Sequence, residues 1–223
     1  MLAAIPPSSP PDTFPPTKYA LLEPNGLLAV GGDLSCERLI AAYTRGIFPW
    51  YSEGDPLLWW TPSPRSVLYP HAFRMSRSLK KTIRRARYSI RVNHAFDEVI
   101  AACAGPRRSG AGTWIDSAMN NAYRALHRQG FAHSIESWDD EGLAGGLYGV
   151  AIGQVFFGES MFARRDDASK VALAHLCTMG YALIDCQLAS AHLDRMGATC
   201  IDRQEFEQAL AALTSLPAVT HAV

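Results

Sequence analysis

Hydrophobic and polar positions alternate through much of the second half of the chain, as they do in β-strands. This pattern predicts strands at residues 133–138, 143–151 and 154–157, and tight turns at 139–142 and 152–153 join them into an antiparallel meander. A helix at 169–180, a strand at 182–188 and short helices at 189–196 and 204–213 are predicted to follow.

The middle of the chain follows the helical period instead. Over residues 74–87 the apolar side chains of Met75, Leu79, Ile83 and Ala86 share one side, which predicts an amphipathic helix. A strand at 88–92 and helices at 96–104 and 117–129 are predicted next. Helices mixed with an antiparallel meander define an α+β sheet domain with flanking helices.

Proline and glycine punctuate residues 14–64, which predicts a small, loop-rich N-terminal domain. One helix is expected there, at 35–45, with Ser35 capping its start and Gly46 closing its end in the left-handed conformation. The predicted organisation is a flexible Pro-rich lead-in over 1–13, the small domain over 14–68 and the sheet domain over 69–223.

The composition is that of a globular protein. The 223 residues are 48% hydrophobic and 19% charged, and no apolar run reaches the roughly 20 residues that span a bilayer. The first 16 residues contain no lysine or arginine and do not resemble a signal peptide. We therefore expect a cytoplasmic protein without a membrane partner. The five cysteines form no CxxC pair and the histidines no HExxH motif, so reduced cysteines and no metal site are expected.

The net charge of zero hides a strongly basic segment. Residues 56–96 contain no aspartate or glutamate but nine of the 21 lysines and arginines. Solvated helix faces usually mix both signs. A solvated face is one interpretation of the basic helix, and a binding surface for phosphates is the other.

Residues 183–188 form the segment with the most informative polar positions. Because side chains alternate on a strand, Asp185 and Gln187 are expected on one face, and Cys186 with Ile184 on the other. The pair could serve as a general base, or an amine-positioning carboxylate, beside an amide donor. A solvent-facing or network role is the alternative. The same alternation argues against Cys186 as a nucleophile.

A second carboxylate, Glu159, ends the meander directly after Gly158, where a bulge or a close backbone approach is possible. It could receive a cationic substrate group, or it could pair with Arg164. An excess of aromatic residues surrounds the loops, and core packing or platforms for bases and apolar side chains are both open to them. These are Trp50, Tyr51, Trp59, Trp60, Trp114 and Tyr123.

The usual cofactor and hydrolase motifs are absent from the sequence. It contains no GxxxxGK[ST], GxGxxG or GxSxG, so nucleotide hydrolysis, dinucleotide redox chemistry and serine hydrolysis have no support. An enzyme of this kind would act on a substrate activated elsewhere.

Several ordered motifs resemble the bacterial leucyl/phenylalanyl-tRNA–protein transferase family. They run from about residue 14 to residue 200 and include Glu23-Pro-Asn-Gly, Gly31-Gly-Asp33, Phe48-Pro-Trp50, Trp59-Trp-Thr-Pro-Ser-Pro-Arg65, Gly112-Thr-Trp114, His133-Ser-Ile-Glu136, Gly145-Gly-Leu-Tyr-Gly149, Gly158-Glu-Ser-Met-Phe162 and Leu183-Ile-Asp-Cys-Gln187. The resemblance implies an acetyltransferase-like (GNAT) catalytic domain over 69–223 that needs no cofactor.

The resemblance also implies an activity and its residues. It implies a monomeric enzyme that transfers Leu or Phe, and less well Met, from aminoacyl-tRNA to proteins that begin with Lys or Arg. This transfer would mark those proteins for N-degron degradation. The implied aminoacyl pocket is Trp114, Leu147, Phe156, Met161 and Leu173. The residues implied to hold the terminal adenosine are Trp50 and Tyr123. Those implied to bind the tRNA phosphates are Arg77, Lys81, Arg84 and Arg85, and those implied to form the reaction centre are Glu159, Asp185 and Gln187. The rival interpretations are an acyl-CoA-dependent N-acetyltransferase and a non-catalytic RNA-binding module.

Overall fold

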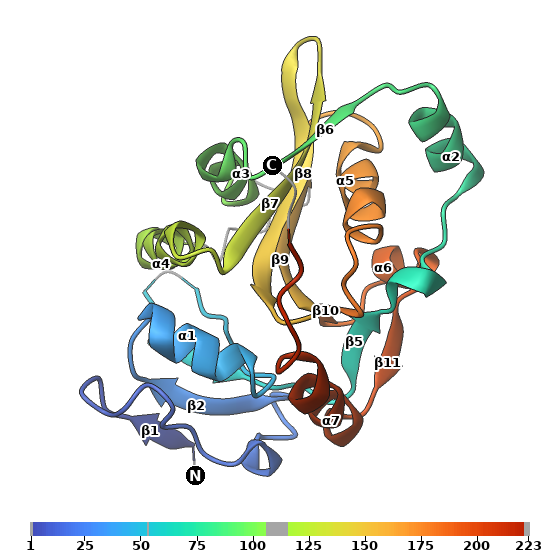
Figure 1. Cartoon of the computed structure of the whole chain (residues 1–223). Helices are drawn as coiled ribbons and strands as arrows, with labels where there is room; N and C mark the ends of the chain where they lie inside the picture. Colours follow the sequence, from blue (N-terminus) through green and yellow to red (C-terminus); the bar gives the residue numbers. More distant parts are fainter. Residues whose placement is uncertain (1, 53, 106–115, 221–223) are drawn as a thin grey trace.

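The larger of two β-sheets forms the centre of the protein (Figure 1). The computed structural model describes residues 2–52, 54–105 and 116–220. The larger sheet has seven strands in the order β11-β5-β10-β9-β8-β7-β6. These strands are β5 (Arg65–Leu68), β6 (Ser89–Val92), β7 (Ala132–Asp139), β8 (Gly142–Ile152), β9 (Val155–Ala163), β10 (Leu183–Gln187) and β11 (Thr199–Ile201).

The predicted meander is confirmed, because β6, β7, β8 and β9 pair antiparallel in chain order. Strand β9 is longer than the predicted 154–157 and continues to Ala163. Strand β10 pairs parallel with β9 and antiparallel with β5. The mixed α+β architecture is therefore as expected from the sequence.

Helices cover both faces of this sheet (Figure 1). The helices that follow the N-terminal domain are α2 (Arg77–Arg84), α3 (Phe96–Cys103), α4 (Ser117–Arg128), α5 (Ala168–Leu176), α6 (Ala191–Arg195) and α7 (Arg203–Leu213). Helices α3 and α4 lie on one face, where Val99 and Leu126 share a buried cluster with Phe157. Helix α5 lies on the other, where Leu173 shares a cluster with Phe156. No helix in the described part of the chain has the length and apolar character to cross a membrane.

The N-terminal domain contains a sheet of its own. Its strands β1 (Ala3–Ile5), β2 (Leu27–Gly31), β3 (Phe48–Pro49) and β4 (Leu58–Trp60) lie in the order β1-β2-β4-β3. Helix α1 (Cys36–Tyr43) begins after Ser35, whose side chain accepts a hydrogen bond from the Arg38 N–H. It is followed by Gly46 at φ 72°, so both predicted helix signals are confirmed.

The prediction of a flexible lead-in over 1–13 is wrong. Residues 3–5 form β1, which pairs parallel with β2. The fully buried Arg38 donates hydrogen bonds to the carbonyls of Ser9 and Pro11, at 2.8 and 3.4 Å. Proline lacks an N–H but keeps its carbonyl, so a Pro-rich segment can still be held by a donor from elsewhere.

The predicted boundary between residues 68 and 69 also needs correction. Strand β5 belongs to the seven-stranded sheet, so the second domain begins at Arg65. In the other direction, α7 returns to the first domain, where Arg203 donates to the carbonyls of Thr17 and Thr61 at 3.1 and 3.0 Å. The two domains are therefore in contact where β5 and α7 begin.

Candidate active site

A pocket of about 150 Å³ lies beside the ends of the parallel strands β9 and β10. Its apolar walls come from the meander, from α5, from β10 and from α6. They are Leu147, Phe156, Met161, Leu173, Leu176, Ile184 and Leu193. Polar groups of Glu159, Asp185 and Gln187 line the same pocket. The structure thus brings together four of the five predicted aminoacyl-pocket residues and all three predicted reaction-centre residues.

A β-bulge directs Glu159. Tyr148 of β8 pairs with Ser160, and the next residue, Gly149, pairs with Gly158, which leaves Glu159 without a partner across the strands. A Cβ on Gly149 would lie 2.2 Å from the Phe157 carbonyl oxygen, closer than any real Cβ contact. The bulge anticipated at Gly158 is present, but the residue that must be glycine is its neighbour on β8.

A second irregularity interrupts β10. Asp185 pairs with Val67 and Gln187 with Ser66, so Cys186 is the extra residue, and Gln187 has φ 62°. The bulge interrupts strict alternation, but Cys186 packs with Ile184 in one apolar cluster, as predicted, and both residues line the pocket. Burial raises the pKa of the Cys186 thiol well above its usual range. The thiol thus stays protonated, which still argues against a nucleophile.

Arg65 was not predicted as a site residue, yet it holds the strand that carries Asp185. Its Nε and Nη2 donate to Oδ1 and Oδ2 of Asp185 at 2.8 and 2.7 Å, and both side chains are buried. Its Nη1 donates to the Gly46 carbonyl at 3.1 Å. The guanidinium also lies 4.7 Å from each of the Phe48 and Phe206 ring centres. An arginine at the first position of a buried apolar strand requires a buried acid as its partner. The position of Arg65 at the start of such a strand is therefore the sequence signal that could have predicted its role.

This ion pair changes the interpretation of Asp185. Its Oδ1 also accepts the backbone N–H of Gln187 at 2.9 Å, so both carboxylate oxygens already have donors. A free general base would leave an oxygen open to the substrate. The geometry favours the alternative network role, in which Asp185 holds Arg65 and fixes the bend at Gln187.

Glu159 occupies the centre of a second buried cluster. Its Oε1 accepts from the Tyr43 hydroxyl at 2.7 Å and from Nε2 of Gln187 at 2.9 Å, and its Oε2 accepts from the Tyr123 hydroxyl at 2.8 Å. Burial raises the pKa of Glu159 to about 7, against the lowering effect of the two tyrosine hydrogen bonds. The alternative pairing with Arg164 is wrong, because Arg164 donates to the Leu143 carbonyl.

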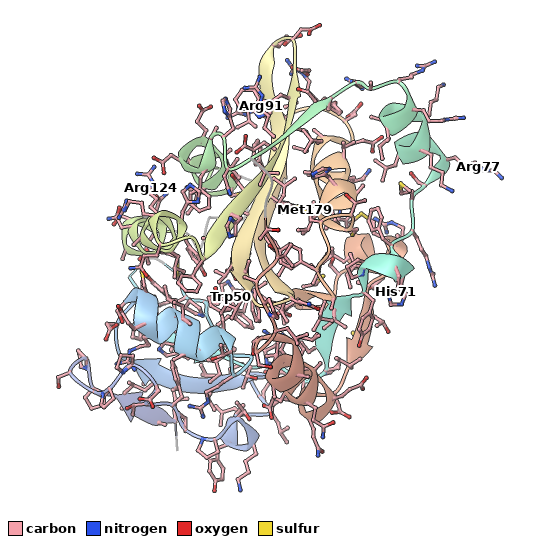
Figure 2. All side chains as sticks on the ribbon, in the orientation of Figure 1. Trp50, His71, Arg77, Arg91, Arg124 and Met179 are labelled. Carbon is pink, nitrogen blue, oxygen red and sulfur yellow. The ribbon has the colours of Figure 1, made fainter. Side chains whose placement is uncertain are left out.

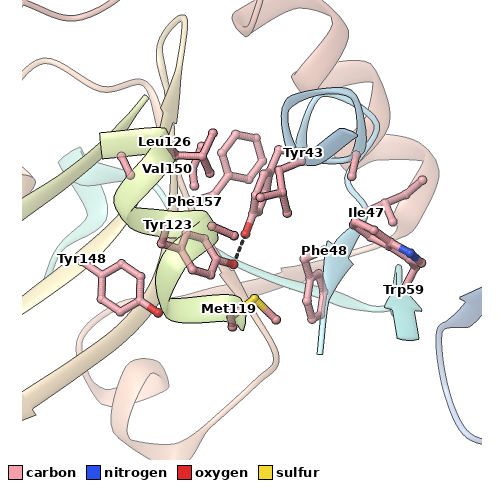
Figure 3. Packing of buried hydrophobic residues seen from close by; sticks show 14 of the residues in the cluster. Tyr43, Ile47, Phe48, Trp59, Met119, Tyr123, Leu126, Tyr148, Val150 and Phe157 are labelled. Carbon is pink, nitrogen blue, oxygen red and sulfur yellow. Dashed lines mark hydrogen bonds between the residues drawn. The ribbon is translucent and has the colours of Figure 1, made fainter. Parts of the chain in front are cut away.

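Neither of the predicted adenosine residues lines the pocket, although the Tyr123 hydroxyl contacts Glu159 beside it. Trp50 is 40% exposed and packs beside Trp60, with ring centres 5.4 Å apart. Tyr123 is fully buried and packs against Tyr148 (Figure 3). Its interpretation as a base platform is corrected here, because neither face of a fully buried ring is open for stacking. The predicted pocket residue Trp114 lies outside the described residues.

The predicted phosphate-binding side chains are exposed on α2. Leu79 is buried and anchors the helix, while Arg77, Lys81 and Arg84 of α2, and Arg85 at its C-cap, are exposed. Figure 2 shows Arg77 projecting away from the body of the protein. None of these four forms an ion pair with an acid among the described residues. The surface is therefore available to a polyanion.

No group of three or more potential metal ligands occurs in the described part of the chain. Fold and site together define a two-domain α+β protein whose apolar pocket ends in a buried carboxylate and amide cluster. Residues 67–211 match the leucyl/phenylalanyl-tRNA protein transferase family, and residues 32–63 match the N-terminal domain of that family. The chain belongs to this family and is thus an enzyme of the aminoacyltransferase class.

Relatives with this family name are similar over most of the chain. The leucyl/phenylalanyl-tRNA–protein transferase of Nitrosomonas europaea is 58% identical over 208 residues, which cover 92% of this chain and 88% of the relative. The protein of the same name from Nitrosospira multiformis is 56% identical, over 91% and 89%. A solved structure of a functionally unknown conserved protein from Staphylococcus epidermidis matches 62% of this chain and 57% of its own, at 13% identity and a TM-score of 0.40. This likeness does not test the acetyltransferase-like expectation, which stays a prediction.

Proposed function

We propose that this enzyme transfers Leu or Phe, and Met less well, from aminoacyl-tRNA to the α-amine of proteins with N-terminal Lys or Arg. The observation that carries the proposal is the pocket, whose apolar walls end at the carboxylate of Glu159 and the amide of Gln187. An apolar side chain can occupy the walls while the adjacent α-ammonium meets the carboxylate. Proteins that receive Leu or Phe would enter N-degron degradation, and we place the monomeric enzyme in the cytoplasm with its tRNA.

The chemistry requires little beyond positioning. The ester of an aminoacyl-tRNA is already activated, so attack by the acceptor amine needs neither ATP nor an enzyme nucleophile. Gln187 donates to Glu159 through Nε2, which leaves its Oε1 to accept a hydrogen bond from the attacking amine. Asp185 supports this arrangement through the backbone N–H of Gln187. The ribose 2′-hydroxyl of the substrate is a route for the proton to the departing 3′-oxygen.

The shape of the pocket predicts which amino acids are accepted. Leu147 and Leu173 enclose the space with γ-branched side chains, and Phe156 adds an aromatic ring. Ile and Val carry a methyl group at Cβ instead, and a misplaced methyl typically costs about 1–3 kcal/mol in discrimination. We therefore expect little transfer of Ile or Val.

Contact with the tRNA falls to α2 in this proposal. Its cations lie on the exposed side of a helix that contains no acids, and they reach phosphates independently of base sequence. Trp50, exposed at the end of β3, remains the candidate platform for the terminal adenosine. Trp114 is proposed as part of the pocket wall on the resemblance alone.

One assay tests the proposal and separates it from its rivals. Purified protein is mixed with labelled Leu-tRNA and a peptide that begins with Arg, with and without acetyl-CoA. We expect label on the peptide without acetyl-CoA, none on an N-acetylated peptide, and much slower transfer from Ile-tRNA. Acetylation of the peptide would support an N-acetyltransferase, and tRNA binding without transfer would support an RNA-binding module.

The N-acetyltransferase alternative has one sequence stretch to consider. It requires a pyrophosphate-binding turn of the form Q/RxxGxG/A, and residues 107–112 read Arg-Arg-Ser-Gly-Ala-Gly. That stretch follows α3 rather than a strand of the central sheet, and it lies outside the described residues. The acetyl-CoA arm of the assay addresses it directly.

A further inference from the structure

Three buried oxygen-bearing side chains meet beside the pocket in a closed set of contacts. The hydroxyls of Tyr43 and Tyr123 lie 2.6 Å apart, the contact drawn in Figure 3. The Tyr43 hydroxyl is also 2.7 Å from Oε1 of Glu159, and the Tyr123 hydroxyl is 2.8 Å from Oε2. Each distance is that of a hydrogen bond between oxygens.

The number of protons available decides the charge of this cluster. Three such contacts need three protons, and two tyrosine hydroxyls supply two. Burial and the adjacent Glu159 raise the pKa values of Tyr43 and Tyr123 well above their usual range, so both keep those protons. An ionised Glu159 supplies none, and one contact would then bring two lone pairs together at hydrogen-bond distance. A protonated Glu159 supplies the third proton.

We propose that Glu159 carries a proton in the empty site, shared in a ring with Tyr43 and Tyr123, and that binding of the aminoacyl α-ammonium releases it. This inference rests on the proposed function, in which Glu159 receives that ammonium. On binding, the O–H bond of Glu159 breaks, the proton passes to water, and the carboxylate pairs with the ammonium. No other covalent bond changes.

The surroundings favour a neutral carboxyl in the empty site. Burial is the largest cause that raises the pKa of Glu159 to about 7. The nearest full charges belong to Arg65 of β5 and Asp185 of β10, and they are already bound to each other. Gln187 of β10, Tyr123 of α4 and Tyr43 of α1 contribute neutral dipoles. A cationic ligand is therefore the group that makes ionisation favourable.

The ring gives the site a criterion for its substrate. An aminoacyl end with a free α-amine is cationic below its pKa of about 7.7–8.0 and can replace the proton. An N-acylated end carries no charge and cannot. The site is thus selective for unblocked aminoacyl groups.

Calorimetry with a stable substrate mimic measures the released proton. The probe is leucyl-adenosine with an amide in place of the ester, titrated at pH 6 in two buffers of different ionisation enthalpy. With a pKa near 7, about 0.9 proton should be released per molecule bound. The N-acetyl probe should bind at least tenfold more weakly and release none. Tight binding of the amine probe without proton release would overturn the inference.

Infrared spectroscopy of the ligand-free enzyme tests the ring without any substrate. At pH 6 we expect a protonated carboxyl band that is absent in Glu159→Gln. Tyr43→Phe and Tyr123→Phe should each shift its frequency, whereas Tyr19→Phe, which removes an exposed hydroxyl, should not. Thermal unfolding confirms that each variant is folded. If the wild-type enzyme lacks the band, the ring is refuted.

The two failures are distinguishable. Transfer of Leu by an enzyme without the band would refute the ring and leave the proposed function intact. The band in an enzyme that transfers nothing would refute the proposed function and leave the protonated cluster in place.

Discussion

Replacing Arg65 by methionine should destabilise the protein and disorganise the reaction centre. The change removes the two guanidinium donors to Asp185 and the donor to the Gly46 carbonyl while it keeps an unbranched side chain between the two phenylalanine rings. Breaking a buried ion pair from one side typically costs about 3–5 kcal/mol, because the other charge stays buried without a partner. That is a large fraction of the roughly 5–15 kcal/mol by which proteins are stable.

Two further variants separate the ion pair from general packing. Arg65→Lys keeps the charge but cannot bind both carboxylate oxygens at once, so an intermediate loss is expected. In Arg65→Met/Asp185→Asn the unpaired charge is gone, so the double variant should lose less than the sum of the two single losses. A coupling of at least about 1 kcal/mol is expected for groups in direct contact.

Urea unfolding followed by circular dichroism measures these losses from the midpoint and slope. The transfer assay then tests function at a temperature where all variants are folded. Arg65→Met should lower kcat strongly and leave the affinity for leucyl-adenosine amide within about threefold, because the apolar walls are intact. A stability loss below about 1 kcal/mol together with unchanged kcat would contradict the assignment of Arg65 as the residue that holds Asp185.

Three other outcomes follow from the same geometry. Arg84→Ala and Arg85→Ala should each weaken tRNA binding and lower the slope of log affinity against log salt by about 0.9 per lost phosphate contact. The control is Arg128→Ala, which removes an exposed arginine on α4 instead. Filter binding at several salt concentrations checks this. Gly149→Ala should lower the free energy of unfolding by at least about 1–3 kcal/mol and abolish transfer, because the new Cβ displaces the bulge that directs Glu159. Urea unfolding measures the first effect and the transfer assay the second. A fully active variant would refute the steric argument. Because the pKa of Glu159 is raised, folding takes up a proton between about pH 4.5 and 7. The free energy of unfolding of the wild type, relative to Glu159→Gln, should therefore fall by roughly 3 kcal/mol as pH rises across that interval. Equal pH profiles for the two proteins would show that the pKa of this carboxyl is not raised.

The sequence predicted those parts of the structure that depend on local patterns. Alternation identified the meander, and the helical period identified the helices on both sides of the sheet. Ser35 and Gly46 marked the ends of α1 because capping and left-handed closure are decided by single residues. Leu147, Phe156 and Met161 lie together at the pocket because the meander places β8 beside β9, and Leu173 joins them from α5.

What the sequence did not show depends on distant partners. Strand β1 lies in a Pro-rich segment without periodicity, and it exists because Ala3–Ile5 pairs with β2 more than 20 residues further on. The role of Arg65 depends on Asp185, 120 residues away. The bend at Cys186 was hidden because alternation assumes an uninterrupted strand, and the donor that holds the bend is a backbone N–H. Such contacts carry no signature within a single sequence window.

The two carboxylates of the candidate site share one architectural requirement. Both project from the seven-stranded sheet, and the N-terminal domain helps to hold each of them. Glu159 is bound by Tyr43 of the N-terminal domain, and Asp185 is bound by Arg65, which is fixed in turn by the Gly46 carbonyl and the rings of Phe48 and Phe206. A buried carboxylate without its donors is strongly unfavourable. The second domain therefore does not complete this candidate site by itself, and the N-terminal domain is part of the site and not only a neighbour of it.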